Sequence, residues 1–342
     1  MNRLKLAISF CCLVPSLMYS GCKEDPVIIQ SQCKLTPLEL SQPLFYPQLI
    51  ASQQNPLTEE GVALGRKLYY DTLLSKGGPH SGKACATCHI QSKSFSLNTS
   101  GTAIIPHVNL AWKTHFLWNG AIDQGLEEAM MFEVNTFFNA DVSHLQKTKT
   151  YPSLYLCAFG DSIVSVENTA NALAQFLRSM TATNSRYDRY LRGQGQLTTS
   201  EKDGMNIFLS EKGDCFHCHT IPLLHDNEFH NIGLEDEFNS SNWGRYAVTN
   251  DSNDIGKFMT PTLTNIELTA PYMHDGRYAT LMDVVEHYNT KVKISNFVDP
   301  ILTKNNKENG LQLSEDDKQD LVAFLKSFTD QSFISNPDFS AP

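Results

Sequence analysis

Two copies of one pentapeptide, Cys-x-x-Cys-His, limit what this 342-residue chain can fold around. The two thiols of each copy are one helical turn apart, so they can add to the two vinyl groups on one edge of a porphyrin. The histidine that follows is then placed to coordinate the iron. The sequence therefore predicts two covalently bound haem c groups. The predicted attachment residues are Cys85, Cys88, Cys215 and Cys218, and the predicted proximal iron ligands are His89 and His219.

Paired cysteines have other roles in proteins. A C-x-x-C pair can bind zinc, but these two pairs lie far apart in the sequence and each carries an adjacent histidine. A thioredoxin-like redox pair would accompany a βαβ pattern, which this sequence lacks. A disulfide framework is an alternative for an exported chain. Cys33 and Cys157 stand outside both motifs, and they can either pair with each other or stay buried as thiols.

The N-terminus has the features of an export signal. A positively charged start is followed by an apolar run over residues 6–18, which is too short to span a membrane. Small residues precede Cys22, as in a bacterial lipoprotein, so Cys22 becomes the lipidated N-terminus or is cleaved away or free. We predict a signal peptide over residues 1–21 and an exported protein, either periplasmic or anchored to the outer membrane through Cys22.

Composition restricts the partners. The formal net charge of −10 argues against nucleic acid or an anionic lipid surface as the main partner, and it permits a basic protein partner. Apolar residues make up 41% and charged residues 19% of the chain, which is an ordinary balance for a globular protein. The length is sufficient for two domains, each with its own core.

Hydrophobic periodicity predicts an all-α chain with long loops. Helices are expected from Thr58 to Tyr70, from Asn168 to Met180 and from Ser314 to Phe328, and a capping box predicts a further helix at Ser200. Long polar loops are expected over residues 98–105 and 228–257. A large bound cofactor can hold loops of this length in place. We predict two tandem cytochrome c-like domains, each around one haem. The predicted segments are the signal peptide (1–21), a lipoprotein tether with an irregular segment (22–55), an N-terminal domain (56–196), a C-terminal domain (197–330) and a tail (331–342).

Further segments carry a family resemblance. They are Leu64–Asp71, Phe116–Gly120, Thr260–Asn265, Ala270–Arg277 and Thr280–Asn289. Together with the two pentapeptides, they resemble the bacterial di-haem cytochrome c peroxidase family, whose relatives include the maturation enzyme of methylamine dehydrogenase. The similarity runs from about residue 57 to residue 328.

The resemblance implies two cytochrome c folds packed face to face. Hydrogen peroxide would react at the N-terminal haem, with electrons passed in through the C-terminal haem from a small exported cytochrome or another redox protein. Trp118 aligns with an aromatic residue that lies between the two haems, although a lone tryptophan is more often a core residue. His274 aligns with a position beside the second haem, where we expect a hydrogen bond near a propionate. Family members are often dimers, so a homodimer is one expectation.

The predicted second ligand of the C-terminal haem departs from the peroxidases. Tyr288 stands where they carry a methionine and where the maturation enzyme carries a ligating tyrosine. A phenolate is a hard, anionic donor that favours ferric iron, whereas a thioether favours ferrous iron. We therefore expect His219/Tyr288 ligation and a low reduction potential. The alternative is that Tyr288 packs on the ring and Met282, Met273 or Met259 binds the iron.

The acid–base group of the reactive site departs from the family pattern. When positions are counted from Trp118 without gaps, the family's distal glutamine and glutamate fall on Glu128 and Phe138. The expected carboxylate, which would move a proton between the two peroxide oxygens, is therefore missing. A small insertion would bring Glu133 into service, and Glu127 is also near. The alternative is that these glutamates are solvated helix residues. The catalytic candidates from the comparison with the family are Glu128, Glu133 and Trp118.

Two further family features are altered. No histidine occurs between His89 and His107, so the removable sixth ligand of many relatives is absent and no reductive activation is expected. The asparagine that helps to bind calcium between the domains aligns with Ala103, which leaves only the carbonyls of Thr269 and Pro271 to contribute.

Three functions are consistent with this pattern. The leading hypothesis is a haem peroxidase. An oxidase that stores two oxidising equivalents and modifies a protein partner is favoured by Tyr288. A di-haem electron carrier without catalysis is favoured by Phe138 at the position of the missing carboxylate.

Overall fold

The computed structural model of the chain describes residues 33–49, 52–97, 103–304, 307 and 310–342. The predicted signal peptide and the proposed lipid anchor at Cys22 lie outside the described residues. The described chain is mainly helical, and its regular strands are β1 (Phe229–His230) and β2 (Phe258–Met259), which pair in antiparallel fashion. None of the described helices combines the length and the hydrophobicity needed to cross a bilayer.

The α-helices follow one another along the whole described chain. They are α1 (Glu59–Tyr70), α2 (Cys85–Cys88), α3 (Leu126–Phe132), α4 (Ser143–Gln146), α5 (Tyr151–Phe159), α6 (Val166–Ser179), α7 (Arg186–Leu191), α8 (Thr199–Phe208), α9 (Tyr246–Thr249), α10 (Leu281–Glu286), α11 (Glu315–Lys326) and α12 (Gln331–Ile334). Two of them continue directly into π-helices. The π-helix Glu133–Phe137 follows α3, and the π-helix His287–Lys291 follows α10.

Local capping explains where the predicted helices begin. The Thr58 side chain accepts a hydrogen bond from the backbone of α1, and Ser314 forms a capping box at α11, as predicted. Two predicted starts were wrong by two residues. The cap of α6 is Ser165, so that helix begins before Asn168, and the capping box of α8 is formed by Thr198 instead of Ser200.

The buried apolar residues form two hydrophobic cores. The N-terminal core contains residues between Leu64 and Ala182 together with Phe333, and it is built mainly on the packing of α1 against α6, with α3 and α5 beside them. The C-terminal core extends from Tyr187 to Phe328 and is built on the packing of α8 against α11, with α10 alongside. We call the parts of the chain around them the N-terminal half and the C-terminal half.

The two halves repeat one local design. Isolated bridges pair Phe116 with Ile122 in the N-terminal half and Tyr272 with Tyr278 in the C-terminal half, and each closes a tight loop. In each loop the residue after the first bridge residue has a positive φ, at Leu117 and Met273. In both halves this loop is followed by an α-helix that runs into a π-helix. The halves are therefore two versions of the same fold, so equivalent positions can be compared.

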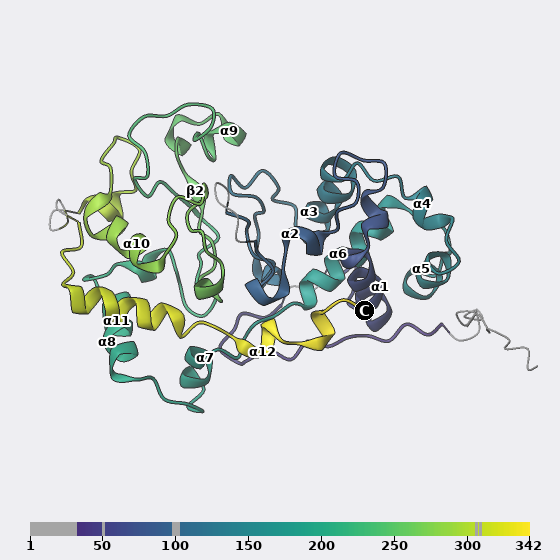
Figure 1. Cartoon of the computed structure of the whole chain (residues 1–342), viewed down its shortest axis with the longest axis horizontal. Coiled ribbons are helices and arrows are strands. Elements are labelled where there is room, and N and C mark those ends of the chain that lie inside the picture. The colour runs from purple at the N-terminus through teal and green to yellow at the C-terminus, as the bar shows by residue number, and fades with distance from the viewer. Residues whose placement is uncertain (1–32, 50–51, 98–102, 305–306, 308–309) are drawn as a thin grey trace, which may run out of the picture.

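The C-terminal tail returns to the N-terminal half (Figure 1). Phe333 on α12 belongs to the N-terminal core. The hydroxyl of Tyr70 on α1 donates to the carbonyl of Phe339 at 2.6 Å. At the other end of the chain, a disulfide joins Cys33 to Cys157 on α5. Both described ends are therefore fixed to the N-terminal half.

Two equivalent buried asparagines each make a pair of hydrogen bonds, and Asn265 connects the two halves. The Nδ2 of Asn265 donates to the Oγ of Ser94 at 2.9 Å, and its Oδ1 accepts from the backbone of Asp330 at 2.7 Å. In the N-terminal half, Asn109 makes a similar pair of bonds with the backbone of Ala182, at 3.0 and 2.8 Å. Because both amides are almost fully buried, loss of these bonds would leave unsatisfied polar groups.

Candidate cofactor and active site

The first Cys-x-x-Cys-His segment forms a single helical turn. The backbone of His89 donates to the carbonyl of Cys85 at 2.9 Å, which closes the turn and places the imidazole beside the two thiols. The Nδ1 of His89 donates to the carbonyl of Phe95 at 2.8 Å. Burial lowers the pKa of His89 to about 4, so its ring is neutral at physiological pH. Its Nε2 is therefore an unprotonated nitrogen suited to bind a metal.

The second segment has the same arrangement. The backbone of His219 donates to the carbonyl of Cys215 at 2.9 Å, and its Nδ1 donates to the carbonyl of Leu224 at 2.9 Å. Burial lowers the pKa of His219 to about 4 as well. Each half thus presents two thiols and one neutral imidazole whose tautomer is set by a backbone carbonyl.

The motif thiols are free. The pairing of Cys33 with Cys157 settles the alternative that the sequence left open, and it leaves the four motif cysteines unpaired. Burial raises the pKa of Cys215 to about 12, and it raises that of Cys85 as well. Without a bound group, these two side chains are therefore protonated thiols.

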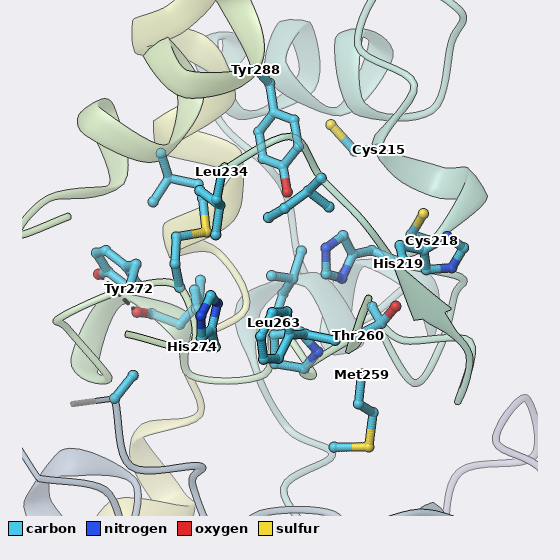
Figure 2. Close-up of a pocket in the computed structure, with 18 of the residues that line it drawn as sticks. Cys215, Cys218, His219, Leu234, Met259, Thr260, Leu263, Tyr272, His274 and Tyr288 are labelled. Carbon is cyan, nitrogen blue, oxygen red and sulfur yellow. Dashed lines mark hydrogen bonds between the residues drawn. The ribbon is translucent and has the colours of Figure 1, made fainter. Parts of the chain in front are cut away.

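A large, mostly apolar cavity opens beside the second segment (Figure 2). Cys215, Cys218 and His219 lie along one side, and residues of the long 228–257 segment, such as Leu234, close another. Tyr288, on the π-helix after α10, points its hydroxyl group into the cavity toward His219. An apolar cavity with two thiols, an imidazole and a facing phenol fits a haem with covalent attachment and two axial ligands.

The methionines are less well placed than Tyr288 to face His219. Met259 lies on the other side of Leu263 from Tyr288 (Figure 2), and its backbone donates to the carbonyl of Trp118 at 2.9 Å. Met273 also lines the cavity, whereas Met282 is not among the lining residues. Burial raises the pKa of the Tyr288 phenol, so this group stays protonated unless a metal or a base takes its proton.

His274 also lines this cavity. Its ring stacks on Phe258 of β2 with the centroids 3.6 Å apart and the planes 12° apart. Burial lowers the pKa of His274, so the ring is a neutral hydrogen-bonding group. The backbone of Thr269 and Pro271, the expected contributors to a calcium site, lies along the same cavity.

Trp118 reaches the cavity from the N-terminal half. Its Nε1 donates to the carbonyl of Ala103 at 2.9 Å, while its own carbonyl accepts from Met259 of β2. Bonds to both halves therefore fix the tryptophan. Trp118 occupies the position in its bridged loop that His274 occupies in the C-terminal half.

Residues of the C-terminal half hold the loop that follows Trp118. The guanidinium of Arg245 donates to the carbonyls of Asn119 and Gly120, and it stacks on Phe229 at 4.5 Å from the ring centroid. Gly120 has a φ of +65°, and a Cβ there would come within 2.2 Å of the Phe229 ring. Only glycine fits this close approach without displacing the ring.

The candidate glutamates occupy different environments. Glu128 is exposed on α3. Glu127 accepts hydrogen bonds from both terminal guanidinium nitrogens of Arg178 at 2.8 Å. Glu133 is mostly buried, and burial raises its pKa to about 7. The charge of Glu133 also raises the pKa of Cys85, which places its carboxyl group near the first thiol pair.

The repeated design relates Glu133 to Tyr288. Gly125 is the N-cap of α3 and Thr280 is the N-cap of α10, and Glu133 follows its cap at the same spacing as Tyr288 follows its own. Both residues stand where the α-helix gives way to the π-helix. Phe138, the position reached by gapless counting, is a buried core residue at the end of the π-helix. Glu133 is therefore the N-terminal counterpart of the residue that faces the second cavity.

Sequence reasoning gave no role to His107. Its ring lies face to face with that of His89, with the centroids 3.5 Å apart. A signal for this position exists in the sequence, because Pro106-His107-Val108-Asn109 resembles a shortened copy of Pro261-Thr262-Leu263-Thr264-Asn265.

Two helical cores, each with a Cys-x-x-Cys-His turn and a partly buried histidine, define a tandem protein of the cytochrome c type. A model of the di-haem cytochrome c peroxidase family matches residues 59–196. The chain is 31% identical over 299 residues to methylamine utilization protein MauG of Methylophilus methylotrophus, covering 81% of this chain and 84% of the relative. It is 30% identical over 312 residues to cytochrome-c peroxidase IdrP2 of Denitromonas iodatirespirans, covering 78% and 81%.

The chain belongs to the di-haem cytochrome c peroxidase family, an oxidoreductase family whose members carry two haems. This confirms the resemblance seen in the sequence. Among solved structures, the fold is similar to a MauG-like protein associated with microbial copper homeostasis, with a TM-score of 0.80 and 28% identity. That similarity covers 89% of this chain and 99% of the other.

Proposed function

We propose that this protein is an exported di-haem peroxidase that reduces hydrogen peroxide to water in its N-terminal half, with electrons relayed through its C-terminal half. One observation carries the proposal. Each half places two free thiols and a carbonyl-fixed, neutral imidazole in one turn, as covalent attachment and axial ligation of haem c require. Cys85, Cys88 and His89 would hold the first haem, and Cys215, Cys218 and His219 the second.

Glu133 would handle the proton. When bound, haem supplies the iron and the redox chemistry of O–O cleavage. The carboxylate of Glu133 would accept the proton of one peroxide oxygen and return it to the other, so that water can leave. A pKa of about 7 suits a group that must take and give a proton near neutral pH. Its equivalence to Tyr288 supports its placement over the reacting face.

His107 would not block that face. The rings of His107 and His89 are stacked face to face with the centroids 3.5 Å apart and the planes 13° apart, so the two imidazoles would lie on one side of a group bound by His89. This geometry places His107 on the same side as the proximal ligand. It supports an N-terminal haem that is open to peroxide without prior reductive activation.

Trp118 would connect the two sites, because it belongs to the N-terminal half and lines the cavity of the C-terminal half. His219 and Tyr288 would ligate the second iron, and His274 would lie beside its haem. The electron donor would be a small exported cytochrome or another redox protein, and the net charge of −10 is suited to a basic donor.

A second candidate function is supported by Tyr288. A phenolate ligand stabilises oxidised iron, which favours an oxidase that acts on a protein partner over a peroxidase fed by a donor. One relative by sequence is a methylamine utilization protein, and one structural relative is MauG-like and associated with copper homeostasis. Calcium between the halves, a lipid on Cys22 and a homodimer remain predictions.

Two measurements test the proposal. Mass spectrometry of the matured protein should show two added haems, and bare protein mass would refute it. Mixing the diferric protein with peroxide in a stopped-flow spectrometer should give a fast Soret change that a reduced donor reverses. A change that persists with the donor present but is reversed by a protein partner would favour the oxidase. No fast change would indicate an electron carrier.

A further inference from the structure

The proximal side of the N-terminal site contains a second, stacked imidazole. The ring of His107 lies 3.5 Å from that of His89 between centroids, and the two planes differ by only 13°. The backbone of His107 donates at 3.2 Å to the carbonyl of Phe95, which also accepts the Nδ1 proton of His89 at 2.8 Å. The carbonyl of Phe95 therefore holds both His89, the proposed ligand, and His107, which stacks on it.

The His107 ring is itself held in place. Its Nδ1 lies 3.1 Å from the hydroxyl of Tyr69, a fully buried residue of α1. A phenol hydroxyl is protonated near neutral pH, so Tyr69 donates and the Nδ1 of His107 accepts. The Tyr69 ring packs edge-on against Phe95 and Phe176, so it cannot easily turn away. The orientation of His107 is thus set by the N-terminal core.

The C-terminal half shows that this imidazole is not required by the fold. There the carbonyl of Leu224 accepts the Nδ1 proton of His219 at 2.9 Å and the backbone of Leu263 at 3.3 Å. Leu263 therefore occupies the position of His107. Two residues later, Asn109 and Asn265 share the left-handed conformation, with φ of 56° and 59°, which supports the equivalence.

We propose that His107 is a positioning residue that fixes the rotation of the His89 imidazole in the half that would react with peroxide. The hydrogen bond to Phe95 sets the direction of the His89 ring but leaves it free to rock about that bond. A flat face at stacking distance blocks this motion, whereas the branched side chain of Leu263 offers no such face in the other half. This inference rests on the proposed role of His89 as an axial ligand.

The test replaces His107 by the residue that the second half uses. In His107→Leu, the electron paramagnetic resonance signal of the ferric N-terminal haem should lose its single form and become heterogeneous, and the iron–histidine Raman band should broaden. Tyr69→Phe should cause a smaller change of the same kind, because it removes only the hydrogen bond that holds His107. His107→Phe keeps a flat face, so it should restore the single form.

Tyr155→Phe is the matched control. Tyr155 is another fully buried tyrosine of the N-terminal core, but its hydroxyl pairs with Thr169 at 2.6 Å, so its loss should leave both spectra unchanged. The signal of the C-terminal haem should be unaffected in every variant.

The outcomes separate this inference from the proposed function. A His107→Leu protein with two haems and spectra identical to the wild type would overturn the role of His107 and leave the peroxidase proposal standing. If His107→Phe were as heterogeneous as His107→Leu, stacking would be excluded as the cause. If His107→Leu failed to mature, the spectra of Tyr69→Phe and Tyr155→Phe would be compared instead. Equal spectra for these two variants would overturn the proposed role of His107. Wild-type protein without haem would refute the proposed function itself.

Discussion

Replacement of Glu133 by glutamine should have opposite effects on activity and on stability. As the proposed acid–base group, Glu133 should contribute about 10²–10⁴-fold to peroxide turnover, and Glu133→Gln should lose that factor. With a pKa of about 7, the wild-type carboxyl is about one tenth ionised at pH 6 and about nine tenths at pH 8. Turnover that depends on the ionised form should therefore rise across this range in the wild type and stay flat in the variant.

The same raised pKa should make the wild type less stable at high pH. Below the ordinary pKa of 4.5 the carboxyl of Glu133 is protonated in both the folded and the unfolded state, so its burial does not lower the free energy of unfolding through ionisation. Between pH 4.5 and 7 the unfolded state releases the proton first, so the free energy of unfolding falls with rising pH. Above pH 7 the penalty is constant, at about 3 kcal/mol. Glu133→Gln should remove this penalty and be the more stable protein at pH 8.

The assay pairs steady-state peroxide reduction at pH 6 and 8 with denaturant unfolding at pH 4.5 and 8, followed by helical circular dichroism. Glu128→Gln is the matched control, because Glu128 is exposed on the helix that leads to Glu133 and should change neither quantity. A Glu133→Gln protein that kept most of the wild-type rate at pH 8 would refute the acid–base role. Equal unfolding free energies at pH 8 would refute the claim that burial raises the pKa.

Further changes should separate stability from electron transfer. Tyr288→Phe should abolish the low-spin spectrum of the C-terminal haem, and an unchanged spectrum would show that another residue is the ligand. Replacing Cys33 and Cys157 by serine should lower the free energy of unfolding by about 3–5 kcal/mol, because the bond closes a loop of 124 residues. Asn265→Ala should cost about 2–3 kcal/mol in denaturant unfolding through two lost buried hydrogen bonds, and a cost near zero would contradict their importance. Arg245→Met should slow electron transfer between the haems in flash photolysis while leaving both haems attached.

Features encoded locally could be predicted from the sequence. The helices at Thr58 and Ser314 carry a capping side chain, acidic first turns and a periodic apolar face, and these signals lie within a few residues of one another. The Cys-x-x-Cys-His spacing placed the thiols and the histidine in one turn, because a turn is a local structure. The family resemblance predicted sites beside the second haem for Trp118 and Tyr288, and both residues line the cavity.

Features that depend on helix register or on distant packing could not be predicted. Gapless counting from Trp118 reaches Phe138, whereas the proposed role of Glu133 rests on its equivalence to Tyr288, which the helix caps of the folded structure reveal. The sequence predicted no role for His107, because its contact with His89 depends on the carbonyl of Phe95, to which both residues donate. The packing of Phe333 into the N-terminal core is a contact between opposite ends of the sequence, which local periodicity does not encode.

The return of Phe333 to the N-terminal core fixes the order in which this protein can be completed. Residues near the end of the chain emerge last during synthesis, so the N-terminal core stays unfinished until Phe333 has been added. Cys85 and Cys88 appear long before that moment. The first thiol pair would thus wait in an open, incompletely packed fold while the attachment machinery works, and the final dozen residues would close it afterwards.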